Sequence, residues 1–307
     1  MLLEEYLDEL GSLDIPVKSS KLVNLSNLLP GELELVKKVW PGIDEGRCRD
    51  IVHRLVELAE DNVELNFDEI FRFCLDDPSW KVRGEAISGL WECEDPSLVK
   101  PLVRLLEDDE AVKVRVAAAS ALGKFMMQAA LGKLSSSRSL RAQETLLAVV
   151  RNEEEPIEVR RRALESIAPL GIPEVRELIQ KAYESKDMKF KASALYAMGK
   201  SAESSWLSNL VKELSSDIPE LRYEVVRACG ELEDEAAIPH IIPILQDPDL
   251  EIRLSAIHAL GCIGGSGARQ GLNQCLESSD EQIRDAAREA LEHLEFWQDP
   301  LGHEVPF

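Results

Sequence analysis

The stretch Asp247-Pro-Asp-Leu-Glu-Ile-Arg-Leu-Ser-Ala-Ile-His-Ala-Leu-Gly261 decides the fold, because its pattern recurs along the chain. An apolar residue followed by a basic one, here Ile252-Arg253, occurs seven times, with the basic residue at positions 83, 115, 160, 191, 222, 253 and 284. The successive steps are 32, 45, 31, 31, 31 and 31 residues, so one insertion of about 14 residues interrupts an even period. A period of this length is typical of stacked helical repeats.

Columns counted from the basic residue as position zero predict the buried face and the ends of one helix per repeat. Positions −1, +3, +4 and +7 are mainly apolar or small and share one helical face, which predicts a buried stripe. Position −6 is mostly Asp or Ser, which favours a helix start. Position +8 is glycine in four repeats, which favours a helix end. These glycines are Gly123, Gly199, Gly230 and Gly261.

A second apolar helix fits between each repeat's end and the next start, as at 98–106. Together these features resemble HEAT repeats, in particular the short type named after phycobilisome lyases, whose pattern is close to Asp-Pro-x-x-x-x-Val-Arg-x-x-Ala-x-x-Ala-Leu-Gly. The resemblance covers about residues 45 to 292. It implies an all-α fold, an α-solenoid that forms a right-handed superhelix of HEAT-like helical hairpins. It implies little about activity, because scaffolds, chaperones, lyases and a few metalloenzymes share this architecture.

The repeat pattern predicts three segments: an N-terminal helical cap at 1–43, a HEAT-like array at 44–292 with an insertion near 124–141, and a C-terminal tail at 293–307. We expect the serine run at 135–137 to be mobile. Position +4 changes from apolar to Arg288 in the last repeat, which predicts a polar end to the array. From His293 onward we expect a non-helical strap packed over the final helices, with disorder as the alternative.

Composition narrows the classes of partner and the compartment. The formal charge of −22 disfavours nucleic acid, whose binding depends on basic residues that neutralise phosphates. Six separate cysteines without a C-x-x-C pair indicate neither a zinc site nor a redox pair. The acidic first ten residues do not resemble a signal peptide, and no apolar run is long enough to span a membrane. We therefore expect a cytoplasmic monomer that binds no membrane.

The motifs of common enzyme classes are absent from the sequence. It contains no H-E-x-x-H, no G-x-S-x-G and no phosphate-binding loop. Deoxyhypusine hydroxylase, a HEAT-like enzyme, holds two irons with several His-Glu pairs, whereas His303-Glu304 is the only such pair here. We therefore expect no metal, no cofactor and no catalytic residue. The alternative is a bilin lyase-like or other small-molecule enzyme on the same fold, although no residue marks a bilin site.

The basic residue at position zero favours a structural role. It lies in the buried stripe, so we expect each guanidinium to bind an Asp side chain or a backbone carbonyl in the turn of its own or the neighbouring repeat. On this basis Arg253→Ala should cost about 3 kcal/mol, because it leaves a buried partner unpaired.

Positions +1, +5 and +9 lie opposite the buried stripe, and in HEAT arrays these helices line the concave surface. In the middle repeats this surface is basic and aromatic, which is typical of interface hot spots. We predict that it binds a protein or peptide partner or an acidic ligand, and that the protein is a non-catalytic interaction scaffold. An ordinary solvated face is the alternative. The candidate residues are Arg161, Tyr196, Tyr223, Arg227 and His258.

Overall fold

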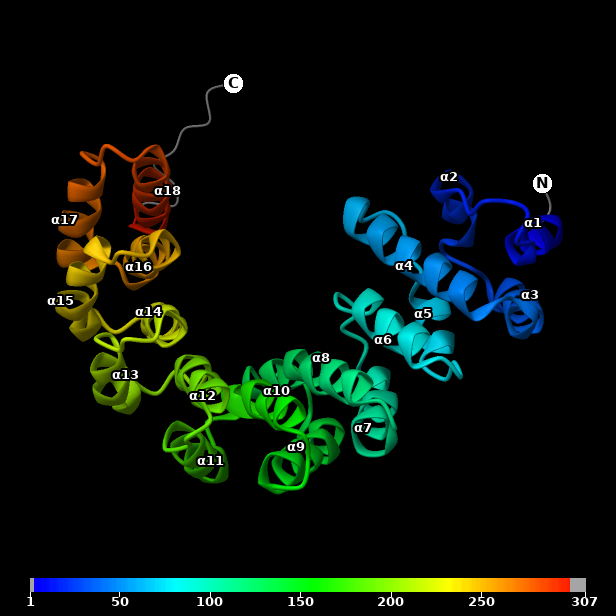
Figure 1. The fold of residues 1–307 in the computed structure, drawn as a ribbon, viewed down its shortest axis with the longest axis horizontal. Coiled ribbons are helices and arrows are strands. Elements are labelled where there is room, and N and C mark those ends of the chain that lie inside the picture. The colour runs from blue at the N-terminus through cyan, green and yellow to red at the C-terminus, as the bar shows by residue number, and fades with distance from the viewer. Residues whose placement is uncertain (1–2, 299–307) are drawn as a thin grey trace. The chain divides into compact units, whose positions relative to one another are not determined.

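The computed structural model describes residues 3–298, and within this range it contains helices and no strand. The prediction of an all-α solenoid of helical hairpins is confirmed (Figure 1). Contacts between residues divide the chain into two compact units, Met1–Leu146 and Leu147–Phe307. The three-segment division made from the sequence stays a prediction.

In the first unit, α4, α6 and α8 pack against one another in sequence, while α5 packs on α6 and α7 packs on α8. The helices are α1 (Leu3–Gly11), α2 (Ser19–Leu22), η1 (Val23–Leu25), α3 (Pro30–Val39), η2 (Trp40–Gly42), α4 (Glu45–Asp61), α5 (Asp68–Cys74), α6 (Trp80–Gly89), η3 (Pro96–Leu98), α7 (Val99–Asp108) and α8 (Val112–Ala130). The next helix, α9 (Ser136–Arg151), crosses the boundary between the units.

In the second unit, α10, α12, α14, α16 and α18 form one layer, and α11, α13, α15 and α17 form the other (Figure 1). The helices are α10 (Ile157–Ile167), η4 (Ala168–Leu170), α11 (Pro173–Tyr183), α12 (Met188–Lys200), η5 (Ser204–Trp206), α13 (Leu207–Glu213), α14 (Pro219–Leu232), η6 (Glu235–Ala237), α15 (Ile238–Ile241), η7 (Ile242–Gln246), α16 (Leu250–Ile263), α17 (Gly265–Cys275) and α18 (Glu281–Gln298).

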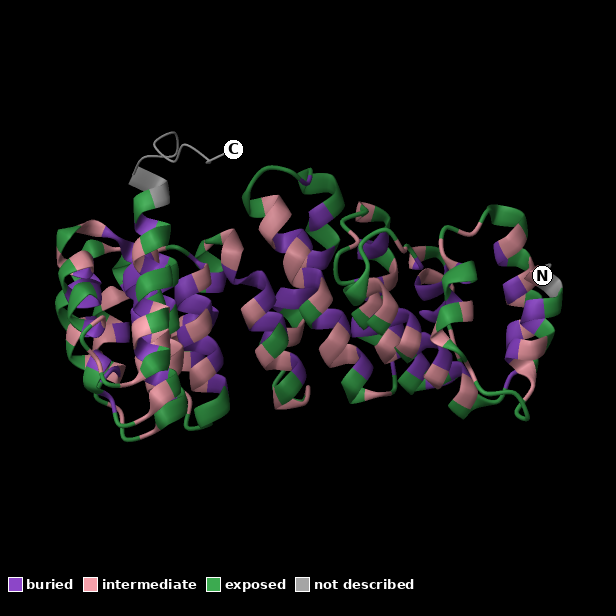
Figure 2. Cartoon of the chain, turned by 90° about the horizontal axis from the view of Figure 1, so that it is seen from above, coloured by how far each residue is buried: buried purple, intermediate pink, exposed green. Residues whose placement is uncertain are grey.

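The predicted buried stripe is confirmed in both units. The residue at position +3 is completely buried in all seven repeats, and the residue at −1 is buried in all seven. Exposed residues gather in the connecting loops and on the outward sides of the helices (Figure 2). The polar end of the array is also confirmed, because the Arg288 side chain is exposed and pairs with Asp285 at 2.7 Å. None of the helices in residues 3–298 combines the length and apolar character that crossing a membrane requires.

The position-zero arginines bind the turns, as predicted. In five repeats Nη1 donates to the carbonyl oxygen of the residue at −6, at 2.7–2.8 Å. Two of these arginines also form bidentate pairs with the aspartate at −6 of the next repeat: Arg83 binds Asp109 at 2.7 and 2.8 Å, and Arg222 binds Asp247 at 2.7 and 3.0 Å. Successive repeats are thereby linked.

The prediction that position −6 starts a helix is off by two residues. The side chain at −6 accepts a hydrogen bond from the backbone N–H two residues later, as Asp247 does from Asp249 at 2.9 Å. The helix itself begins after position −4, where the Asp249 side chain accepts from the N–H of Glu251 at 2.9 Å. The residue at −6 therefore forms the turn, and the side chain at −4 caps the helix in the three repeats that have aspartate there, at Asp187, Asp249 and Asp280.

The prediction that the +8 glycines end helices is wrong, because all four lie inside helices. For three of them the reason is close packing: a Cβ atom on Gly199 would lie 2.7 Å from the Cα of Ala228, and Gly230 and Gly261 meet Ala259 and Ala290 in the same way. In four consecutive repeats φ is positive at position +11 instead, at Gly171, Ala202, Glu233 and Gly264, where it lies between 51° and 74°.

The insertion and the tail also differ from expectation. Residues 124–130 continue α8 and residues 136–151 form α9, so the serine run lies at the start of a helix. Burial of Phe125, Met126 and Leu134 anchors the inserted segment. Likewise α18 continues through His293 to Gln298 instead of giving way to a strap, and residues 299–307 lie outside the described range.

Candidate functional site

The candidate site lies on one surface of the second unit, built from α10, α12 and α14. It takes its side chains from positions +1 and +5 of these helices, which face away from the buried stripe, and from position +2, which lies between the exposed and buried faces. Because equivalent positions recur in each repeat, side chains on neighbouring helices come side by side. We call this group the central cluster: Arg161, Glu165, Ser193, Tyr196, Tyr223, Glu224 and Arg227.

Arg227 is the centre of the aromatic part of the cluster. Its guanidinium carbon lies 5.8 Å from the ring centroid of Tyr196 and 5.7 Å from that of Tyr223, which are cation–π distances. The ammonium of Lys200, at position +9, lies 5.8 Å from the Tyr196 ring and pairs with Glu231 at 2.6 Å. The two tyrosines thus hold a partly exposed guanidinium in a defined place.

Arg161 belongs to a hydrogen-bonded chain at the other end of the cluster. Its Nε donates to the hydroxyl of Ser193 at 2.8 Å, and this hydroxyl donates to Oε1 of Glu165 at 2.6 Å. Ser193 is almost fully buried, and Glu165 also pairs with Arg162 at 2.5 Å. A buried serine therefore fixes the directions of both Arg161 and Glu165.

Glu224 is the least satisfied charged group of the cluster. Its Oε2 is buried and accepts no hydrogen bond, and the nearest cation is Nη1 of Arg227 at 3.7 Å. Burial raises the pKa of this carboxyl, and the nearby Glu165 raises it further, while Arg227 and Arg161 oppose the shift. Burial likewise raises the pKa of Tyr196, so its phenol keeps its proton at neutral pH. Glu224 can therefore exchange a proton or accept a hydrogen bond from a ligand N–H.

The arrangement as a whole suits an extended, flat ligand that carries negative groups. Two guanidinium groups, of Arg161 and Arg227, can bind carboxylates, because arginine forms paired hydrogen bonds with them. The rings of Tyr196 and Tyr223 offer surface against which a conjugated system can pack. Glu224 adds a carboxyl group between these elements.

Four of the five residues predicted from the sequence meet in this cluster, and the fifth does not. Arg161, Tyr196, Tyr223 and Arg227 belong to it, whereas the ring of His258 lies 3.7 Å from Sγ of Cys262 in its own helix. Within residues 3–298, no hydrogen bond or ion pair joins His258 to the cluster. Whether these residues bind a partner stays a prediction.

Sequence reasoning missed three residues of the cluster, Glu165, Ser193 and Glu224, and two of its neighbours, Lys200 and Glu231. Ser193 and Glu224 occupy position +2, between the exposed and buried faces, and we had not assigned that column to the surface. Lys200 and Glu231 occupy position +9, which the helical period does place on the exposed face. A comparison of the residues at position +9 across the repeats would have identified Lys200 and Glu231.

The family of HEAT repeats matches residues 68–140 and 206–292, together more than half of the 307 residues. The chain belongs to the HEAT-repeat family. A solved structure of Kap95p with RanGDP shares the fold with this HEAT-repeat protein: the TM-score is 0.53 at 13% identity, over 98% of this chain and 47% of that one.

Two curated relatives carry names of biosynthetic or enzymatic function. The bilin biosynthesis protein PecE of Mastigocladus laminosus is 38% identical over 78 residues, which are 25% of this chain and 29% of PecE. Deoxyhypusine hydroxylase-B of Oryza sativa subsp. japonica is 25% identical over 243 residues, which are 73% of this chain and 80% of the hydroxylase. The match therefore covers less than a third of the length of PecE.

The expectation that the protein is not an enzyme is wrong in the light of these relatives, which point to catalytic activity. The expectation rested on missing motifs such as H-E-x-x-H and G-x-S-x-G. Those motifs belong to other folds, so their absence carries no weight for chemistry arranged on the surface of a helical array.

A di-iron centre of the hydroxylase kind does not fit the described residues. Residues 3–298 contain no group of three or more His, Cys, Asp and Glu side chains placed to hold a metal ion.

Proposed function

We propose that this HEAT-repeat protein is an enzyme of the bilin-lyase kind, which binds an open-chain tetrapyrrole or a similar flat, carboxylate-bearing molecule on the central cluster. The observation that carries the proposal is the placement of Arg227 within cation–π distance of two tyrosine rings, beside the carboxyl of Glu224, whose buried Oε2 accepts no hydrogen bond. The relation to PecE supports the choice of ligand class.

The chemistry of the ligand matches the cluster group by group. An open-chain tetrapyrrole carries propionate carboxylates, which Arg161 and Arg227 would bind. Its conjugated pyrrole rings would pack against Tyr196 and Tyr223, and its pyrrole N–H groups would donate to Glu224. In this proposal the protein would join the pigment to another protein. The protein or peptide partner predicted from the sequence would then be the acceptor of the pigment.

Binding of biliverdin, an available open-chain tetrapyrrole, tests the proposal. We expect the purified protein to change the visible absorption spectrum of biliverdin in a saturable way. The Arg227→Ala variant should raise the dissociation constant at least tenfold, because it removes the cation that both tyrosines position.

Arg288→Ala provides the matched control, because Arg288 is an exposed arginine of the same unit that lies outside the cluster. It should bind biliverdin as the wild type does. An unchanged spectrum with the wild-type protein, or equal affinities for the wild type and Arg227→Ala, would refute the proposal.

A further inference from the structure

One link between successive repeats of the second unit is incomplete, and it is the link at Arg253. In a complete link, Nε and Nη2 of the position-zero arginine bind both oxygens of the aspartate at −6 of the next repeat, as Arg222 binds Asp247. The repeat that follows Arg253 has Ser278 at this position. Ser278 keeps the turn, because its hydroxyl accepts the N–H of Asp280 at 3.2 Å and its carbonyl accepts from the next position-zero arginine at 2.8 Å. The sequence therefore keeps the geometry of the link and omits its carboxylate.

The guanidinium of Arg253 is held as it is in a complete link. Its Nη1 donates to the carbonyl of Asp247 at 2.8 Å, as Nη1 of Arg222 donates to the carbonyl of Ser216 at 2.8 Å. Within residues 3–298, Nε and Nη2 of Arg253 donate no hydrogen bond, and the ion pair of Nη2 with Asp280 is long, at 3.9 Å. The side chain is 25% exposed. Two parallel donors are thus fixed in direction and accessible from solvent.

Two other basic residues of this unit also face a serine at −6 of the next repeat, and each has another partner. Arg160 donates from Nε to the carbonyl of Val150 at 3.1 Å. Lys191 pairs with Glu213 at 2.7 Å. A missing aspartate is therefore compensated within the protein at these two positions, whereas at Arg253 the two donors stay open.

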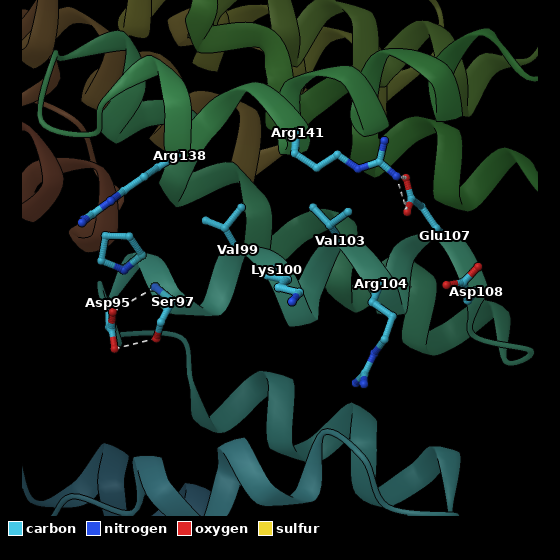
Figure 3. Close-up of a pocket in the computed structure, with 11 residues that line it drawn as sticks. Asp95, Ser97, Val99, Lys100, Val103, Arg104, Glu107, Asp108, Arg138 and Arg141 are labelled. Atoms are coloured by element: carbon cyan, nitrogen blue, oxygen red, sulfur yellow. Dashed lines mark hydrogen bonds and ion pairs between the residues drawn. The ribbon is translucent and has the colours of Figure 1, made fainter.

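A pocket of about 740 Å³ lies at the incomplete link. Arg253 and Ser278 both line it, together with residues of η7 and of the end of α17. In the groove between α7 and α9 of the first unit, by contrast, Arg141 already binds both carboxylate oxygens of Glu107, at 2.7 and 2.8 Å (Figure 3). The pocket at Arg253 shares no residue with the central cluster, so an inference about it does not rest on the proposed function.

The two carboxylates that line the pocket limit the charge of a ligand without excluding a carboxylate. Asp280 stands at position −4, which Asp249 occupies beside the complete link, and each of them caps the helix that follows it. An aspartate at −4 is therefore compatible with a carboxylate bound to the arginine. Glu277 is exposed and adds a second negative charge. Because like charges repel, the pocket favours a ligand with one negative charge over a dianion.

We propose that this pocket binds a small organic acid through a single carboxylate, which takes the position that the aspartate at −6 occupies in the complete links. The carboxylate accepts paired hydrogen bonds from Nε and Nη2 of Arg253, the arrangement that the chain itself uses at Arg222. The rest of the ligand lies against Ile242 and Pro243, which line the pocket and keep surface in contact with solvent. The volume of the pocket is within the roughly 300–1,000 Å³ that is usual for small-molecule sites.

Benzoate, a singly charged acid with a flat apolar body, is the probe that tests the proposal. Its addition to ¹⁵N-labelled protein should shift the backbone amide signals of Ser279 and Asp280, which line the pocket, in a saturable way in two-dimensional NMR spectra. In Ser278→Asp the new carboxylate binds Arg253, so the dissociation constant of benzoate read from the same signals should rise about tenfold or more. Benzylamine, which has the same ring and the opposite charge, should leave these signals unchanged.

Ser205→Asp is the matched control, because it makes the same charge change at an exposed serine of the second unit that does not line the pocket. It should bind benzoate as the wild type does. A measurement without ligand tests the geometry separately: Ser278→Asp should raise the melting temperature by about 3 °C relative to Ser205→Asp, because it completes the link.

Four results would overturn the proposal. They are the absence of a saturable shift in the wild type, equal affinities of the wild type and Ser278→Asp for benzoate, binding of inorganic phosphate or benzylamine at these signals as tightly as benzoate, and equal melting temperatures of Ser278→Asp and Ser205→Asp.

Discussion

The link between Arg222 and Asp247 should contribute strongly to the stability of the second unit because both side chains are nearly buried, and its removal is our main prediction. Both oxygens of the Asp247 carboxylate accept from Arg222, and one also accepts the backbone N–H of Asp249. The two side chains are only 12% and 5% exposed. Truncating Arg222 therefore leaves a nearly buried carboxylate with a single donor.

From this geometry we expect Arg222→Ala to lower the free energy of unfolding by about 3 kcal/mol. This value is at the lower end of the range for breaking a buried ion pair, because part of the guanidinium is in contact with water. Arg253→Ala, for which the sequence suggested a similar cost, should lose only about 1 kcal/mol. Arg253 is 25% exposed and lies 3.9 Å from Asp280, so its main contribution is the bond to the carbonyl of Asp247.

Urea unfolding followed by far-UV circular dichroism measures these losses. A double-mutant cycle with Arg222→Ala and Asp247→Asn should give a coupling energy of about 2 kcal/mol, because both substitutions break the same contact. A loss below about 0.5 kcal/mol for Arg222→Ala, or additive effects in the cycle, would refute the reasoning.

The same link predicts a dependence on pH. The hydrogen bonds from Arg222 lower the pKa of Asp247 below its ordinary value of 3.8. Because the folded state holds this proton less tightly than the unfolded state, the stabilisation is complete above the ordinary pKa and is lost as the pH falls through the lowered value. The difference between wild type and Arg222→Ala should therefore be full at pH 6 and shrink as the pH falls below the ordinary pKa of 3.8.

Three further predictions concern single positions, all measured by urea unfolding. Gly199→Ala should destabilise the protein by about 1–2 kcal/mol, because the added Cβ would meet the backbone of Ala228. Gly84→Ala, which has open space around it, should stabilise the protein by about 0.5 kcal/mol. Equal effects of the two substitutions would contradict the close packing at Gly199. Ala202→Gly should stabilise by about 0.5–1 kcal/mol, because Ala202 has a φ of 52°, and a loss of stability would contradict the strain. Burial raises the pKa of Glu224 in the folded state above its ordinary value of 4.5. The wild type should therefore lose stability relative to Glu224→Gln as the pH rises above 4.5. If the stabilities of the two proteins changed in parallel with pH, the raised pKa would be excluded.

Much of the fold could be predicted from the sequence because burial leaves a clear periodic signal. The small residue at +3 and the apolar residue at −1 are buried in every repeat, and the arginine bonds followed from their place beside that stripe. The ends of the helices were harder to predict from the sequence. At +11 the left-handed residue is alanine or glutamate in two repeats, so residue type does not mark the turn.

The glycines at +8 were misread for a physical reason. Glycine serves both at left-handed helix ends and where two backbones come close, and the sequence of one helix does not distinguish these uses. The neighbouring small residue, such as Ala228 opposite Gly199, lies 29 positions away and carries the missing information. The candidate site shows a similar limit: the exposed columns were found, but the pairing of Glu224 with Arg227 depends on burial that no column displays.

The glycine and alanine pairs have a consequence for the second unit as a whole. Gly199, Gly230 and Gly261 let α12, α14, α16 and α18 approach until backbone nearly meets backbone, while the helices of the other layer have no such succession of pairs within the described residues. A double layer whose helices are spaced more narrowly on one side than on the other must bend toward the narrow side. The size of one residue per repeat thus sets the curvature of this unit, and with it the width of the hollow surface on which Arg227 and its tyrosines stand.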